Sequence, residues 1–372
     1  MGTAPFPCRM KRFLLSLLCL ALQLHAAAPP DHQARFLAGL SVDATELEPL
    51  AREESWQTHS ASFHRAWLDL EDRQLSKIRN WMPATLNYIY EDPSPLFYTF
   101  SGPDFLYANA FFPNASTYIL CGREPVGTLP DVAALSPESR ASALGNLRTA
   151  LNAILSFSFF ITADMKNDLN QTQLSGTIPV LYVFLSRAGC RIISAELVKL
   201  SAAGDLTTDK SKTPGVKIRF IGTTGKEQTL YYFTTDLSNW GIKSNPAFMA
   251  FCRKQGQGNG FVKAASYLMH MPEFSDVRDF LLTNTRHIIE DDSGIPLKYF
   301  AGDQWMVSLY GNYPGPIELF KQHFQTDLDA AFRAGASGDL PFGVGYQWKP
   351  GISSLLVSTA FRAAPKAQPV EE

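Results

Sequence analysis

The sequence of 372 residues lacks any apolar run long enough to cross a bilayer. Its clearest apolar run, Phe13 to Leu24, falls short of the roughly 20 residues that a transmembrane helix needs, and no later segment reaches that length. We therefore expect no transmembrane segment. The sequence also has no basic run, and its formal net charge of −2 is mildly acidic. Both features argue against a nucleic-acid partner.

Cysteine is scarce as well. Of the five cysteines, only Cys121, Cys190 and Cys252 lie beyond residue 28. Their wide spacing carries no metal signature, so we predict no metal and no cofactor. We expect three buried small hydrophobic side chains, with at most one disulfide.

Several common catalytic motifs are absent. The chain contains no G-x-S-x-G, H-E-x-x-H or C-x-x-C, no dinucleotide-binding fingerprint and no phosphate-binding G-x-x-x-x-G-K-[ST]. Their absence weighs against the common hydrolase, metalloprotease, redox and dinucleotide classes. No internal repeat or low-complexity linker divides the chain either, so we predict one globular domain over residues 29–363 and a polar, disordered tail over 364–372.

The N-terminus has the pattern of a secretory signal. Arg9, Lys11 and Arg12 precede the apolar run, and small residues end at Ala28. We predict a signal peptide over residues 1–28, with Met10 as a possible true start. Removal of three positive charges takes the formal charge to −5. The mature protein is then exported, either periplasmic or extracellular. In a eukaryotic host, the sequons at Asn114 and Asn170 would become relevant.

Hydrophobic periodicity predicts an α+β fold. Helical spacing covers residues 44–82 and Ser136–Phe157, while Pro179–Arg187 fits helix or strand. Alternation then predicts a central antiparallel meander flanked by helical blocks. Its strands are Arg191–Leu200, Val216–Ile221 and Thr229–Thr234. Further strands are expected at 97–100, 118–121, 304–310, 342–348 and 353–361, with helices at 316–324 and 327–334.

The stretch from Gly256 to Gly294 carries the densest set of reactive side chains. We predict a helix over Phe261–Met271, entered through a glycine-rich helix–helix connection. Helical spacing places four polar side chains on one face: Lys263, Ser266, Tyr267 and His270. Lysine or histidine beside serine could act as a base to a nucleophile, or the group could bind an anion. A solvated helix face is the alternative.

A second helix is predicted to run from Ser275 into Asp291 and Asp292. Acids at the C-terminal end of a helix oppose its dipole by about 0.3–1 kcal/mol each. Such a local conflict favours a functional role, although an ion pair or simple exposure would also explain it. Asp292 also begins an aspartic-peptidase-like D-S-G. We discount that match because a charged helix end precedes it and no second copy exists.

Four further residues are predicted to bind a ligand. Asp104 and Tyr107 lie in an aromatic cluster after an expected strand, and Arg123 and Asp236 each follow a strand end. The cluster could instead be core, and Arg123 could form a surface pair with Glu124.

Two functions fit these features best. The first is an exported protein that binds a small molecule or an envelope component without turnover. The second is a hydrolase of an envelope or extracellular polymer that uses Asp291 and Asp292 with Lys263, Ser266 and His270. A third, envelope scaffolding, would require a large exposed apolar patch.

Overall fold

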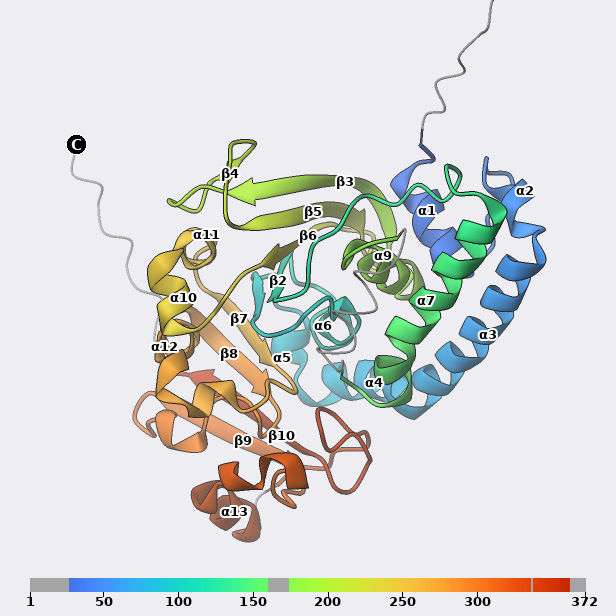
Figure 1. Cartoon of the computed structure of the whole chain (residues 1–372). Coiled ribbons are helices and arrows are strands. Elements are labelled where there is room, and N and C mark those ends of the chain that lie inside the picture. The colour runs from blue at the N-terminus through green and yellow to red at the C-terminus, as the bar shows by residue number, and fades with distance from the viewer. Residues whose placement is uncertain (1–26, 160–173, 336, 362–372) are drawn as a thin grey trace, which may run out of the picture.

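The computed structural model describes residues 27–159, 174–335 and 337–361 (Figure 1). Almost all of the predicted signal peptide, the sequon at Asn170 and the predicted tail over 364–372 lie outside these residues.

Within the described residues, one mixed sheet runs through the molecule in the order β4-β3-β5-β6-β2-β1-β7-β8-β10-β9. The strands are β1 (Leu96–Tyr98), β2 (Thr117–Gly122), β3 (Arg191–Leu200), β4 (Leu206–Thr207), β5 (Pro214–Ile221), β6 (Glu227–Thr234), β7 (Gly258–Val262), β8 (Thr285–Glu290), β9 (Trp305–Gly311) and β10 (Ser354–Ala360).

The centre of this sheet is parallel. Strands β6, β2, β1, β7 and β8 pair in parallel, whereas β4, β3 and β5 at one side and β10 and β9 at the other pair antiparallel. The predicted antiparallel run of β3, β5 and β6 is confirmed, but as one flank of a mixed sheet. The prediction that this antiparallel run forms the centre of the sheet is wrong, since parallel strands occupy that place. The sequence pattern does not reveal them, because the buried strands β1 and β7 are short and do not alternate between apolar and polar residues.

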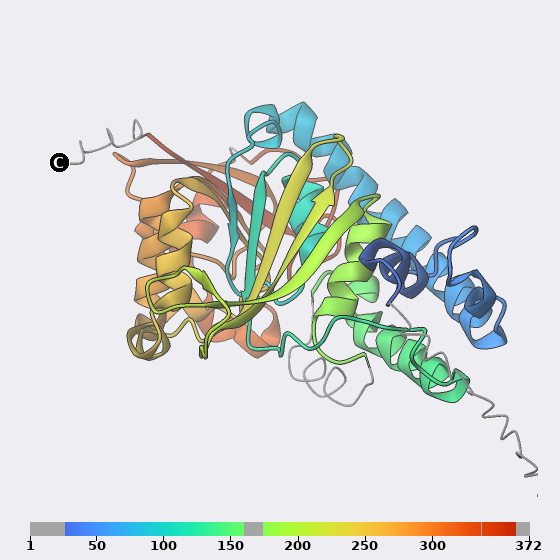
Figure 2. The same ribbon diagram turned by 90° about the horizontal axis from the view of Figure 1, so that it is seen from above.

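Helices cover both faces of the sheet, as the view from above shows (Figure 2). One face carries α1 (Pro30–Leu37), α2 (Glu48–Ala51), α3 (Glu54–Leu70), the π-helical turn η1 (Glu71–Leu75), α4 (Ser76–Thr85), α5 (Asn87–Tyr90), α6 (Phe105–Phe111), α7 (Pro137–Ser156) and α9 (Ile178–Arg187). The other face carries α10 (Asn239–Ser244), α11 (Ala247–Lys254) and α12 (Ser275–Asn284).

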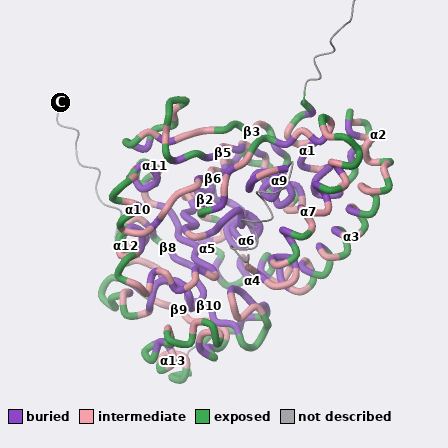
Figure 3. The backbone as a smooth tube through the Cα atoms, viewed as in Figure 1, coloured by how far each residue is buried: buried purple, intermediate pink, exposed green. Residues whose placement is uncertain are grey.

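The two helical layers bury alternate side chains of the central strands. In β1, Leu96 and Tyr98 join the core under α6, and Phe97 joins the core under α12. Burial on both faces produces the continuous apolar character that is typical of parallel strands. The most deeply buried backbone therefore runs through the middle of the molecule (Figure 3).

Most predicted helices are confirmed. Ser136 caps α7 by accepting a hydrogen bond from the Ser139 amide, and the ambiguous segment Pro179–Arg187 belongs to the helix α9. Near the C-terminus, α13 (Thr326–Arg333) is also helical. Short 3₁₀ turns join the remaining elements: η2 (Leu268–His270), η3 (Pro272–Phe274), η4 (Leu297–Tyr299) and η5 (Glu318–His323). The strand predicted over 342–348 is wrong, because that segment contributes only an isolated bridge between Val344 and Gln347.

The stretch from Gly256 to Gly294 folds differently from its prediction. Residues Gly258–Val262 form β7 rather than the start of a helix, and α12 ends at Asn284, after which the chain forms β8. Gly258 permits close packing against β1 and Gly260 packs against β8, so these glycines do not form a helix–helix link. A Cβ atom at Gly258 would lie 2.2 Å from the carbonyl oxygen of Pro95.

This close approach predicts that Gly258→Ala destabilises the fold by about 1–3 kcal/mol, because the Pro95 backbone must shift. Gly302→Ala is the matched control, since a Cβ there meets nothing within 4 Å. Urea unfolding measures both variants. Equal free energies of unfolding for the two variants would contradict the account of β7 packing.

Candidate functional site

A pocket of about 140 Å³ opens at the carboxyl ends of β1, β2 and β7. The chain leaves β1 towards α6 on one face of the sheet and leaves β7 towards α12 on the other. Neighbouring parallel strands whose connections diverge in this way create a crevice at the topological switch point of a sheet. The pocket walls come from residues 98–104, 122–124, 159 and 263–268.

A buried ion pair joins the two loops that form this crevice. Lys263 Nζ lies 3.0 Å from Asp104 Oδ2, and both side chains are only 2% exposed. The Tyr98 hydroxyl donates to the same oxygen at 2.8 Å, and the Tyr107 amide donates to Asp104 Oδ1 at 3.1 Å. Lys263 also donates to the Ser158 carbonyl, and its Nζ lies 4.0 Å from the centroid of the Tyr107 ring. Each buried charge is thus compensated, as low dielectric surroundings require.

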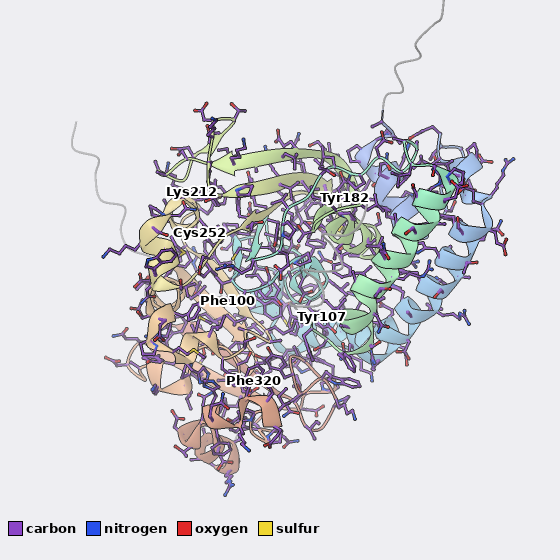
Figure 4. The ribbon with its side chains drawn as sticks, viewed as in Figure 1. Phe100, Tyr107, Tyr182, Lys212, Cys252 and Phe320 are labelled. Atoms are coloured by element: carbon purple, nitrogen blue, oxygen red, sulfur yellow. The ribbon has the colours of Figure 1, made fainter. Side chains whose placement is uncertain are left out.

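The backbone of the pocket loops adopts conformations that side chains disfavour. Phe100, Ala264, Ser266 and Tyr267 all have positive φ, between 51° and 59°. Each non-glycine residue in this region costs on the order of 1–2 kcal/mol, which surrounding contacts must offset. Phe100 lies near the centre of the molecule, and Tyr107 belongs to α6 (Figure 4). Strain of this kind gathers at functional sites.

Asp291 and Ser293 hold the strained turn after β7. Asp291 Oδ2 accepts the Ala264 amide at 2.9 Å, and Ser293 Oγ accepts the Ala265 amide at 2.8 Å. Asp291 Oδ1 accepts the Ser293 hydroxyl at 2.5 Å. Burial raises the pKa of Asp291, while these hydrogen bonds and the Lys263 charge oppose that rise. The side chain therefore acts as an anchor for the turn.

Asp292 is fixed in the same manner. Its Oδ2 accepts the Tyr267 hydroxyl at 2.6 Å, and its side chain is buried. Burial, followed by the neighbouring Asp291 charge, raises the pKa of Asp292 to about 7. The preceding Glu290 is also buried, accepts the Ile295 amide at 2.8 Å and has its pKa raised by burial.

These acids correct the prediction of a helix end. Glu290 closes β8, and Asp291 and Asp292 follow that strand, so no helix dipole opposes them. The D-S-G motif is therefore preceded by a strand and not by a charged helix end. No second D-S-G or D-T-G occurs in the chain, so the match still lacks the partner carboxylate that the peptidase mechanism needs.

His270 and Ser266 do not share one site. His270 lies in a separate depression with Lys298 and His323, and burial lowers its pKa to about 4. Ser266 lines the switch-point pocket, where its hydroxyl lies 3.0 Å from the Tyr346 hydroxyl. Tyr346 donates its own proton to the Ala264 carbonyl, and burial raises its pKa to about 12. Tyr346 is therefore a poor base towards Ser266.

The four residues predicted to bind a ligand lie close to one another. Asp104 and Arg123 line the pocket, and the Tyr107 ring lies beside Lys263. Arg123 Nη1 donates to Asp236 Oδ2 at 2.5 Å, so its partner is Asp236 rather than Glu124. Glu124 is instead buried against the Tyr232 hydroxyl.

The pocket residues that were not predicted from the sequence include Tyr98, Phe100 and Ser101. The turn signal at Gly102-Pro103 marks their position, directly after a strand. The three later cysteines are free and buried, and Asn114 is buried with its amide donating to the Tyr90 carbonyl.

Among the described residues, no group of three or more His, Cys, Asp and Glu side chains could hold a metal ion. In the same part of the chain, no helix is both long and apolar enough to cross a membrane. No family model, curated protein or solved structure matches the chain.

The buried pair predicts a large cost for removing one partner. Lys263→Met leaves Asp104 buried without its cation and should destabilise the protein by about 3–5 kcal/mol. Lys263→Met combined with Asp104→Asn should recover part of that loss, because no uncompensated charge remains. Urea unfolding of both single variants and the double variant gives the coupling. Additive losses would contradict a direct interaction between the two residues.

The raised pKa of Asp292 predicts a pH dependence. Because the folded state holds this proton more tightly, the stability contributed by protonation is present at low pH. It is lost as pH rises from about 4 to about 7. The free energy of unfolding of the wild type should therefore fall relative to that of Asp292→Asn across that window, as measured by chemical unfolding at pH 4.5, 6 and 7.5. A difference that stays constant with pH would contradict it.

Proposed function

We propose that this chain is an exported binding protein that holds a small polar ligand in the switch-point pocket. The observation that carries the proposal is the construction of that pocket. It lies where α/β sheets bind ligands, and its walls present charged, hydroxyl and aromatic side chains. Export rests on the basic and apolar N-terminal pattern.

Preorganisation supports binding. The Lys263–Asp104 pair connects the two loops, and Asp291, Ser293 and Tyr346 fix the strained turn after β7. A site whose loops are held before the ligand arrives loses less conformational entropy on binding. The strained backbone at Phe100 and Ser266 persists only because surrounding contacts fix the shape of the pocket.

The hydrolase alternative has weaker support. The carboxylates of Asp291 and Asp292 accept hydrogen bonds from the Ala264 amide and the Tyr267 hydroxyl, and neither residue lines the switch-point pocket. His270 lies in another depression. Among the described residues, the Ser266 hydroxyl pairs with the hydroxyl of Tyr346, which donates its proton to the Ala264 carbonyl.

Binding is tested with Arg123→Ala. A panel of amino acids, organic acids, amines and sugars is screened by thermal unfolding. A ligand at 100 times its Kd should stabilise the wild type by about 2.7 kcal/mol. Arg123→Ala should weaken the binding of an anionic or zwitterionic hit by tenfold or more, because Arg123 is a cationic residue that lines the pocket.

Arg219→Ala is the matched control, since Arg219 also forms an exposed ion pair on the sheet, with Glu227. Its affinity for the hit should equal that of the wild type. The proposal fails if no compound stabilises the wild type. It also fails if both arginine variants lose affinity to the same extent.

A further inference from the structure

We infer that the ligand of this pocket is an α-amino acid with an apolar side chain, an inference that rests on the proposed binding function. The argument depends on a second depression, which adjoins the first. It encloses about 120 Å³, and its apolar walls include Cys121, Leu237 and Phe274. The two depressions share four wall residues: Phe100, Gly122, Arg123 and Leu268. They therefore form a polar lobe and an apolar lobe of one site.

Arg123 stands at the junction of the lobes. Its Nη1 donates to Asp236 Oδ2, and Asp236 Oδ1 in turn accepts the Ser238 amide at 3.0 Å. This chain of contacts orients the guanidinium. The planar group has five N–H donors, and its remaining edge matches the two oxygens of a carboxylate. The junction is thus suited to a carboxylate group.

The polar lobe is suited to an ammonium group. Its walls include the Asp104 carboxylate and the hydroxyl groups of Tyr98, Ser101 and Ser266, all of which offer oxygen lone pairs. Lys263 also lines this lobe, where Asp104 compensates its charge and the Ser158 carbonyl accepts a hydrogen bond from its amine. An ammonium group in this lobe would gain charge-assisted hydrogen bonds from these oxygens.

The apolar lobe is suited to a compact hydrocarbon side chain. Leu237 and Cys121 are buried, and the Phe274 and Phe100 rings meet edge to face with centroids 5.8 Å apart. Each lobe is smaller than the roughly 300–1,000 Å³ typical of pockets for drug-sized ligands. A carboxylate at the junction, an amine on one side and a hydrocarbon on the other reproduce the three substituents of an apolar amino acid.

Isothermal titration calorimetry of the full mature chain tests the class. Leucine is the reference probe. Of the other three probes, 3-methylbutylamine lacks the carboxylate, 4-methylpentanoate lacks the amine, and 2-hydroxy-4-methylpentanoate has a hydroxyl in place of the amine. Leucine should bind at least tenfold more tightly than any of the others. Glutamate should bind at least tenfold more weakly than leucine, because its carboxylate would enter the apolar lobe.

Phe274→Ala tests the lobe itself. Removal of the ring enlarges the apolar lobe, so the affinity for tryptophan relative to that for leucine should rise by about tenfold. Phe324→Ala is the control, because Phe324 is an exposed aromatic side chain in a different depression. Its ratio should equal that of the wild type, so a general loss of stability cannot mimic the result.

Three outcomes overturn the inference. If the hydroxy acid binds as tightly as leucine, the amine is not recognised. If Phe274→Ala leaves the selectivity ratio unchanged, the apolar lobe does not hold the side chain. If amino acids fail while another compound binds in an Arg123-dependent manner, the class is wrong and the proposed binding function stands. Failure of every compound in the wider panel would overturn the proposed function itself.

Discussion

The buried ion pair between Lys263 and Asp104 is the interaction on which the site depends. Asp104 caps α6 after β1, and Lys263 begins the turn after β7, so their contact fixes the two walls of the crevice relative to each other. Such a pair contributes little net stability compared with an apolar contact, but the loss of one partner is costly. The pair therefore specifies the shape of the pocket more than it strengthens the fold.

Asp291 and Asp292, which follow β8, also fix the shape of the pocket. Asp291 and Asp292 have the features of catalytic carboxylates, since both are buried and have raised pKa values. Their contacts indicate a structural role, because Asp291 holds the Ala264 amide and Asp292 holds the Tyr267 hydroxyl. A perturbed pKa can thus follow from burial next to a strained turn.

The sequence predicts long, strongly periodic elements well. The capped helix α7 and the alternating strands β5 and β6 follow from their own residues. The parallel centre could not be predicted in this way. In β7, Gly258 and Gly260 are explained by contacts with β1 and β8, far away in the chain, and the polar residues that follow imitate a helical face. Proximity of Lys263 to Asp104 likewise arises only from strand order, although both residues stood out as candidates.

A crystal structure of the protein grown with leucine tests the central claim most directly. The account predicts leucine at the junction of the two lobes. Its carboxylate should contact Arg123, its amine should face Asp104 and its side chain should lie against Phe274. Leucine bound at full occupancy elsewhere on the molecule, with only water in the crevice between β1 and β7, would contradict the account.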